Sequence, residues 1–355
     1  MKRLYLVLSF LLLSWILVFA FKKPPSSLPG EENYKAQQDD FPKLTGPYLG
    51  QKPPGMTPEI FAPGIVSLGF HEHGMALSPD GKDIFYVAAD ARFSRYVIMH
   101  SQLSAGEWTE PRVASFSGKE IDLSPAFSPD GKRLYFASKR PLTTPAGPKN
   151  DFDIWYVERT VDGWSAPLNP GGPVNTEKNE VNPAFMSDGT LVFQALEKLG
   201  SLAWDIYIAE WKNGAYAPPE KMPPPVNTEF NESGPFIAPD GSYILFNSNR
   251  PHGLGIMSMF VSFRSSAGGW SEPVNLKGKL GSPDRCGDFG PVVSPNGRFL
   301  FFSSFRNSEP IEPKSVKHSE EMKKLLGSPV AGKGTLYWID AKIIDDYRPK
   351  GSWKR

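Results

Sequence analysis

One hairpin pattern occurs five times in this chain, and it constrains the fold more than any other feature of the sequence. Each copy has an alternating apolar stretch, a Pro-Asp-Gly-like turn and a second β-rich run. Asp-Gly or Asn-Gly between such runs is the strongest short-range signal for a β-hairpin. The turns are centred on Asp80, Asp130, Asp188, Asp240 and Asn296. Hairpins repeated in this way predict equivalent units that bury their faces against their neighbours.

A third apolar stretch follows each hairpin, and a fourth follows in four of the five copies. The third stretches include "DIWYVERT" and "DIYIAEWK". The fourth is marked by an aromatic residue three positions before a proline, at Trp108, Trp164, Tyr216 and Trp270. Four antiparallel strands in a repeat of roughly 50 residues are typical of a propeller blade. The pattern therefore predicts an all-β fold, a β-propeller of five four-stranded antiparallel blades.

The fifth repeat ends after "GTLYWIDAKII" without a fourth strand. The segment "TPEIFAPGIVS", which begins at Thr57 before the first hairpin, can supply that strand. In the last blade it would close the ring without a covalent link and leave no unpaired edge. Six blades are the alternative, but no sixth turn motif supports them.

The repeat itself resembles a known type. "LSPAFSPDGKRLYFAS", "DIWYV", "PVNTEKNE" and "PVNTEFNE" are similar to the Pro-Asp repeat of TolB-type propellers, and the resemblance extends from Pro58 to Lys342. It implies the propeller fold. It does not imply one function, because this repeat type occurs in periplasmic binding proteins, in accessory domains of peptidases and in exported proteins without an assigned role.

The segments that flank the repeats predict export. Lys2 and Arg3 precede a nearly continuous apolar run from Leu4 to Phe21, so residues 1–21 are interpreted as a signal peptide or as an uncleaved signal anchor that would tether the protein to a membrane. Residues 22–56 are rich in Pro, Ser, Gly and charge and are interpreted as a tether or lead-in. The propeller is assigned to residues 57–345 and a tail to 346–355. We expect a periplasmic or extracellular location.

Charge and cysteine content exclude some partners and links. The formal net charge of +1 gives no reason to expect a nucleic-acid partner. Cys286 is the only cysteine, so the chain has no internal disulfide. We expect a monomer.

Two charged positions recur in register with the turns. Eight residues before each turn centre stands an acid; these acid positions are Glu72, Asp122, Glu180, Glu232 and Asp288. Ten residues after the centre stand Asp90, Arg140, Lys198, Arg250 and Arg306. The acids begin the innermost strands, which predicts a ring around one mouth of the central channel. Either the acids and bases form structural ion pairs across the hairpin, or the ring binds a cation or a polar ligand.

The first blade departs from this pattern in two ways. Asp90 replaces the base, so Glu72 has no obvious partner. His71 and His73 flank Glu72 and lie on one face of the strand, where they could bind a divalent transition metal with Asp90 or Asp288 nearby. This metal is the only cofactor that the sequence suggests. The alternative is that His73 caps the channel and His71 packs in the seam between blades.

The connections between second and third strands vary in length and share the end that carries the acids. In the longest, "SEEMKKLLG" predicts a short helix with Ser319 as N-cap, acting as a lid or as a cover for apolar surface. We therefore expect a protein or glycan ligand at this loop-rich face. The leading function is a binding module of the cell envelope without catalysis. The alternative is a carbohydrate-active or metal-assisted hydrolase or lyase that uses the channel mouth around Glu72.

Overall fold

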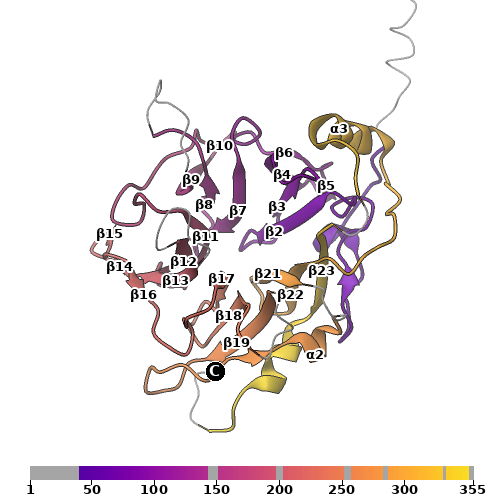
Figure 1. Ribbon diagram of the computed structural model, residues 1–355. Helices are drawn as coiled ribbons and strands as arrows, with labels where there is room; N and C mark the ends of the chain where they lie inside the picture. Colours follow the sequence, from indigo (N-terminus) through magenta and orange to yellow (C-terminus); the bar gives the residue numbers. More distant parts are fainter. Residues whose placement is uncertain are drawn as a thin grey trace, which may run out of the picture. The chain divides into compact units, whose positions relative to one another are not determined.

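Five antiparallel sheets stand around a central axis in the computed structural model (Figure 1). The structure describes residues 40–142, 151–196, 203–251, 257–282, 287–330 and 333–351, and the compact unit that contains the sheets begins at Phe41. Each sheet has four strands in the ring, which confirms the predicted all-β propeller of five blades. Within the described ranges, no helix is both long and apolar enough to cross a membrane.

Each blade begins at the channel and runs outward. Blade 1 contains β2 (His71–Leu77), β3 (Asp83–Ala89), β4 (Tyr96–Ser104), β5 (Glu107–Trp108) and β6 (Arg112–Val113). Blade 2 contains β7 (Asp122–Phe127), β8 (Arg133–Ser138), β9 (Asp153–Thr160) and β10 (Gly163–Trp164). Blade 3 contains β11 (Glu180–Phe185), β12 (Leu191–Leu196), β13 (Trp204–Ala209) and β16 (Glu220–Lys221), with a side hairpin of β14 (Trp211–Lys212) and β15 (Ala215–Tyr216).

Blade 4 contains β17 (Glu232–Ile237), β18 (Tyr243–Ser248), β19 (Ser258–Phe263) and β20 (Val274–Asn275). Blade 5 contains β21 (Asp288–Val293), β22 (Phe299–Ser304), β23 (Thr335–Asp340) and β1 (Glu59–Ile60). The remaining elements are short helices: η1 (Tyr48–Gly50), α2 (Lys277–Leu280), α3 (Val316–Leu326) and η2 (Ala341–Tyr347).

The ring closes as predicted. Strand β1 pairs antiparallel with β23, with Glu59 opposite Trp338 and Ile60 opposite Tyr337. The seam between blades 5 and 1 is also joined near the channel, where the Ser303 hydroxyl donates to the carbonyl of Glu72 at 2.7 Å. Because both chain ends of the propeller contribute to one sheet, that sheet has no open edge at the closure.

The cores lie between the blades. Successive residues of β3 point to opposite seams: Ile84 and Tyr86 pack with blade 5, and Phe85 and Val87 pack with blade 2. All seven residues of β3 are buried. This explains why the second strands of the repeats are almost continuously apolar, since both faces of each blade are covered.

A bulge occurs at the same place in every inner strand. The residue six positions before the turn centre has a left-handed conformation, with φ between 54° and 62°, at Gly74, Ser124, Asn182, Gly234 and Gly290. The strand register shifts there in all five blades. A bulge re-aims the side chains on either side of it. Residues before the bulge and residues after it therefore face different surroundings.

Residues on both sides of the predicted propeller range of 57–345 contact the blades. In the lead-in, from Phe41 on, Leu49 is buried, and the indole of Trp108 donates to the carbonyl of Gly46 at 2.7 Å. At the other end, the guanidinium of Arg348 lies over the ring of Phe263 at 4.8 Å. Residues 1–39, which include the predicted signal segment, lie outside the described ranges, as do residues 352–355 of the predicted tail.

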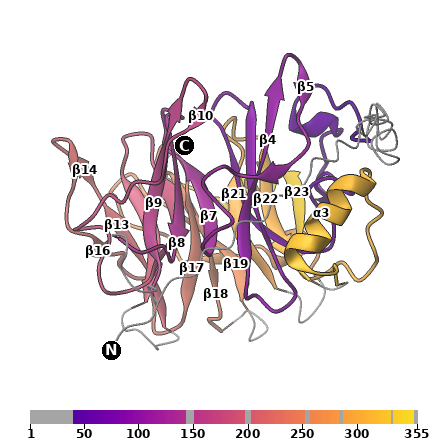
Figure 2. The same cartoon turned by 90° about the horizontal axis from the view of Figure 1, so that it is seen from above.

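Helix α3 begins one turn earlier than predicted. Its N-cap is Ser315, whose hydroxyl accepts from the amide of His318 at 3.1 Å, and Ser319 is buried inside the helix. Met322 and Leu326 pack into the core between blades 5 and 1. In Figures 1 and 2, α3 lies at the rim of the ring, on the side away from β14. The helix therefore covers apolar surface instead of the channel.

Candidate functional site

The five acid positions begin the inner strands, as predicted, but their side chains do not line the channel. The exposed fraction of each residue is 4% or less. Each acid lies before the bulge of its strand and faces the residue on the second strand that pairs with it, at Ala88, Ser138, Ala195, Ser248 and Ser304. The acids are therefore buried within and between blades.

In blades 2, 4 and 5 the acid is paired with the predicted arginine. The distances between guanidinium and carboxylate are 2.7 Å for Arg140 and Asp122, 3.0 Å for Arg250 and Glu232, and 2.8 Å for Arg306 and Asp288. Burial raises the pKa of Asp288, and the charge of Arg306 opposes that shift. The predicted ion pairs are thus present in these blades.

A short motif, Phe-x-Ser-x-Arg, builds each pair. In blade 4, the Nε of Arg250 donates to Ser248 at 3.2 Å and the guanidinium lies 5.0 Å from the ring centre of Phe246. Its remaining donors reach the carbonyls of Pro225 and Val226. The same serine and phenylalanine positions support Arg140 and Arg306. The arginine thereby joins the acid, its own blade and the segment that leads into the blade.

Blade 3 holds its acid differently. The hydroxyl of Thr176 donates to the Oε1 of Glu180, and Lys198, the predicted base, lies outside the described residues. In blade 4 the equivalent Thr228 donates to Glu232 at 2.8 Å. The recurring "PVNTE" thus has a structural role. Its asparagine also bonds both backbone groups of a third strand, as Asn227 does with Ile206 at 2.9 and 2.7 Å.

Glu72 in blade 1 has an environment without a counter-charge. Its Oε1 accepts from the amides of Leu68 and Phe70, both at 3.0 Å. Its Oε2 is buried and has no hydrogen-bond partner among the described residues, and the same is true of the hydroxyl of Tyr86. Burial raises the pKa of Glu72 well above its ordinary value, against the pull of the backbone amides. Burial therefore favours the neutral carboxylic acid form of Glu72.

Asp90, which replaces the base in blade 1, has a local role. Its carboxylate accepts from the amides of Ser94 at 2.7 Å and Arg95 at 3.1 Å, and from the hydroxyl of Ser94 at 2.6 Å. These bonds shape the turn between β3 and β4, in which Phe93 has a left-handed φ of 57°. The turn presents the ring of Phe93, which is 40% exposed.

His71 and His73 lie side by side at the seam of blades 1 and 5, with ring centres 4.7 Å apart. The Nδ1 of His71 accepts from the amide of Gly334 at 3.0 Å, and its ring is stacked on Phe289 and Phe305. Burial lowers the pKa of His71 to about 2 and that of His73 to about 4. No group of three His, Cys, Asp or Glu side chains suited to a metal ion occurs among the described residues. The metal site stays a prediction without a third ligand.

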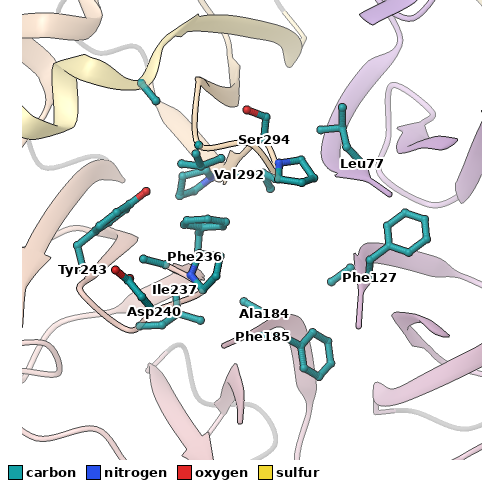
Figure 3. A pocket seen from close by; sticks show the side chains of 18 of the residues that line it. Leu77, Phe127, Ala184, Phe185, Phe236, Ile237, Asp240, Tyr243, Val292 and Ser294 are labelled. Atoms are coloured by element: carbon teal, nitrogen blue, oxygen red, sulfur yellow. The ribbon is translucent and has the colours of Figure 1, made fainter. Parts of the chain in front are cut away.

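A large hollow lies at the opposite end of the channel, among the hairpin turns. This funnel has a volume of about 640 Å³. Figure 3 shows side chains from the five blades around one common space. Its wall consists of residues that follow the bulges, among them Pro125, Pro183, Pro235, Pro291, Leu77, Phe127, Ala184, Phe185, Phe236 and Val292.

The wall of the funnel is apolar and stiff. Four of the five inner strands have a proline directly after the left-handed residue, and proline fixes φ. Phe127, Phe185 and Phe236 are each only half-buried. Charged groups stand on one side only, where Asp240 meets Lys342, Asp345 and Arg348. Such a site can hold an apolar group in a rigid ring and orient it by the charges on one side.

Sequence reasoning placed the ligand at the loop-rich face and regarded the hairpin end as plain. The signal that could have predicted the funnel is present in "LSPAFSPDG" and its equivalents, where apolar residues continue after the bulge of the inner strand as far as the turn. Three to five positions before each turn centre, the residues follow the bulge, and several of their side chains line the funnel at the axis.

Comparisons with known proteins agree on the fold. No protein-family model and no curated protein match the chain. Among solved structures, a TolB from Agrobacterium tumefaciens is similar with 21% identity and a TM-score of 0.43, over 66% of this chain and 70% of that chain. TolB from Acinetobacter baumannii is similar with 17% identity and a TM-score of 0.40, over 77% of this chain and 57% of that chain. A thermostable family-43 glycoside hydrolase is similar with 12% identity and a TM-score of 0.49, over 82% and 95%.

The similar structures thus include TolB proteins and a glycoside hydrolase, and at these identities the likeness concerns the fold alone. The five blades described above carry the structural conclusion: this chain is a five-bladed β-propeller, and its Pro-Asp repeat resembles that of TolB-type propellers.

Proposed function

We propose that the protein is an exported binding module of the cell envelope, and that the funnel holds an apolar segment of a partner polypeptide. The observation that carries this proposal is the contrast between the two ends of the channel. The funnel offers about 640 Å³ with an apolar wall, whereas the acids that could perform chemistry are buried at 4% exposure or less.

The chemistry of the funnel supports a polypeptide ligand. The half-buried phenylalanines offer a surface that apolar side chains can cover, and aromatic residues dominate the energetics of such contacts. The charges on one side have both signs, since Lys342 and Arg348 stand beside Asp240 and Asp345. Backbone amides, carbonyls and side chains of a peptide can satisfy both kinds of charge. A rigid wall also reduces the entropy lost on binding.

The buried acids support a scaffold role for the predicted channel-mouth ring. A general acid or base must lie within hydrogen-bond reach of its substrate. Asp122, Glu232 and Asp288 are occupied by arginines, and Glu72 is enclosed by backbone amides. We therefore favour binding over a hydrolase that uses Glu72.

The test is a peptide selection on the full chain, immobilised after purification from the periplasm. Peptides from a random displayed library are enriched on the parent protein, and their dissociation constants are measured by calorimetry. Val292 lines the funnel and is partly exposed, so Val292→Trp should fill the space and abolish binding, and Phe236→Ala should weaken binding about tenfold. Phe305→Ala, at the other end of the channel, is the matched control and should leave binding unchanged.

Two results would contradict the proposal. One is a set of enriched peptides whose affinity does not change in Val292→Trp, with thermal melting showing that the variant is folded. The other is hydrolysis of a panel of p-nitrophenyl glycosides by the parent protein that is lost in Glu72→Gln.

A further inference from the structure

A second hollow of about 520 Å³ leaves the funnel and runs outward between blades 2 and 3. This groove shares four lining residues with the funnel, Ser128, Pro129, Phe185 and Ser187. It continues to the side hairpin of β14 and β15, which projects at the edge of blade 3 in Figure 2. The two hollows are thus continuous at one point of the wall.

The groove exists because the turn between the first two strands of blade 3 is shorter than the equivalent turn of blade 2. In blade 3 the first paired residue after the turn, Leu191, comes three positions after the turn centre. In blade 2 the equivalent residue, Leu134, comes four positions after the turn centre, so the turn of blade 3 is one residue shorter. Ser187 also replaces the proline of the other copies, and its amide donates to the carbonyl of Pro239 in blade 4 at 2.7 Å. The shortened turn is thereby held toward blade 4, on the side away from blade 2.

The outer end of the groove is formed by an exposed aromatic pair. Asn213 and Gly214, with φ of 54° and 81°, form the tight turn between β14 and β15. Trp211 is 40% exposed, and its ring meets the edge of Tyr216 with a centre distance of 4.7 Å and an angle of 70°. A Cβ on Gly189 would lie 3.4 Å from Trp211, so the indole rests directly on the short turn.

Polar groups face the indole from blade 2. Arg133 and Glu158 form an ion pair at 2.9 Å, and their side chains are 38% and 45% exposed. The other charged residues of the lining are Asp130, Lys132, Arg159 and Asp188. An exposed pair of this kind can donate and accept hydrogen bonds from a ligand without leaving a buried charge unpaired.

We propose that the groove binds a glycan chain, with one sugar ring against Trp211 and its hydroxyls on Arg133 and Glu158. A pyranose ring has an apolar face of C–H groups and a rim of hydroxyls that both donate and accept. The groove presents the complementary arrangement, one indole beside a guanidinium–carboxylate pair. Because the site is open along the seam, it suits an internal unit of a chain.

A peptide suits the groove less well than it suits the funnel. Peptides are commonly held by an unpaired strand edge or by a deep apolar pocket. Charged or polar residues make up most of the lining of the groove, and its aromatic residues are Trp211, Tyr216, Tyr135 and Phe185.

The experiment is calorimetric titration of the full chain with three soluble oligosaccharides: cellohexaose, xylohexaose and N-acetylated chitohexaose. At least one should bind, with quenching of tryptophan emission. Trp211→Ala should weaken that binding about tenfold, and Trp211→Phe should retain most of it, since a smaller aromatic face remains. Glu158→Gln keeps the shape of the side chain and should also weaken binding. Phe93→Ala removes an aromatic residue of equal exposure, 40%, at the other end of the channel and is the matched control.

The possible outcomes distinguish the glycan proposal for the groove from the peptide proposal for the funnel. Val292→Trp should leave glycan binding unchanged, so a failure of the funnel as a peptide site does not affect the result. Absence of binding by all three oligosaccharides would overturn the proposal, as would equal affinities of the parent, Trp211→Ala and Glu158→Gln. Selected peptides that lose affinity in Trp211→Ala but not in Val292→Trp would show that the groove takes a peptide, and would also overturn it.

Discussion

Glu72 of blade 1 and Glu232 of blade 4 occupy the same position of the repeat and have opposite electrostatic environments. Both are at most 1% exposed. Glu232 accepts from Arg250, Ser248 and Thr228, so its charge is balanced where it is buried. Glu72 accepts only from backbone amides among the described residues, and burial raises its pKa.

The difference arises from two substitutions on the neighbouring strand. Blade 4 has Ser248 and Arg250 where blade 1 has Ala88 and Asp90. The backbone places both acids at the same position of the blade, and the residues at and after the end of the second strand decide whether the acid has a counter-charge. The seam of blades 5 and 1 therefore lacks a central ion pair at Glu72 and is joined by Ser303, His71 and the pairing of β1 with β23 instead.

The largest effect is expected from removing the cation of the balanced pair. Arg250→Met leaves Glu232 buried without a counter-charge, which should lower the free energy of unfolding by about 3–5 kcal/mol in urea denaturation. Arg298→Met is the control, because Arg298 also stacks on a phenylalanine, Phe299, but is exposed. It should cost about 0.5 kcal/mol or less. Equal losses in the two variants would mean that the ion pair does not stabilise the blade.

The two glutamates should respond to the same substitution with opposite signs. In the folded protein Glu72 keeps its proton at a pH where the unfolded chain has lost it, so the stability of the parent falls as pH rises above about 4.5. Glu72→Gln removes this loss and should raise the free energy of unfolding at pH 7. Glu232→Gln deprives Arg250 of its charge partner and should lower it.

Urea denaturation of both variants at pH 5 and pH 7 measures these signs. The gain in Glu72→Gln should be larger at pH 7 than at pH 5. A loss in both variants at pH 7 would show that Glu72 is ionised in the folded protein, contrary to the environment described here.

The histidine pair should make the same seam sensitive to acid. The pKa of His71 is lowered to about 2 and that of His73 to about 4, so both remain neutral in the folded protein while the unfolded chain takes up protons below 6.5. Stability should therefore be lost as pH falls from 6.5, by about 2 kcal/mol for each histidine at pH 5. His73→Gln should remove the part of this acid-induced loss of stability that is due to His73.

Glu72→Gln is the appropriate background for this measurement, because the titration of Glu72 acts in the opposite direction over the same range. In that background, the difference in the free energy of unfolding between pH 7 and pH 5 no longer contains the contribution of Glu72 and reports on the histidines. An unchanged difference between the two pH values in His73→Gln would show that His73 titrates normally.

The smallest effect is expected at the hydrogen bond that joins blades 5 and 1. Ser303→Ala removes the donor to the carbonyl of Glu72 and should cost about 1 kcal/mol. Ser308→Ala changes an exposed serine of the same blade and should cost a few tenths of a kcal/mol or less. If the two variants unfold alike, the seam is held by β1 and its packing alone.

Much of the fold could be predicted because its signals are local. An Asp-Gly turn between alternating strands specifies a hairpin within about a dozen residues, and five copies specify a ring that must close on itself. The pairs of arginine and acid could also be predicted, since residues eight positions before and ten positions after a turn centre meet across one hairpin. The position of α3 in the fold was harder to predict from the sequence, because "SEEMKKLLG" shows where a helix forms and not which core it covers.

The sequence by itself determined the five blades, the closing strand and the register that brings three of the acids near their arginines, because these depend on spacing along the chain. Only the tertiary structure decided which groups face the channel. The bulges at Gly74, Ser124 and their equivalents turn the acids into the seams and the following prolines and phenylalanines to the axis. It also decided that Glu72 is buried without a counter-charge and that blade 3 opens a groove. Both follow from burial and from contacts between blades, which no spacing along the chain records.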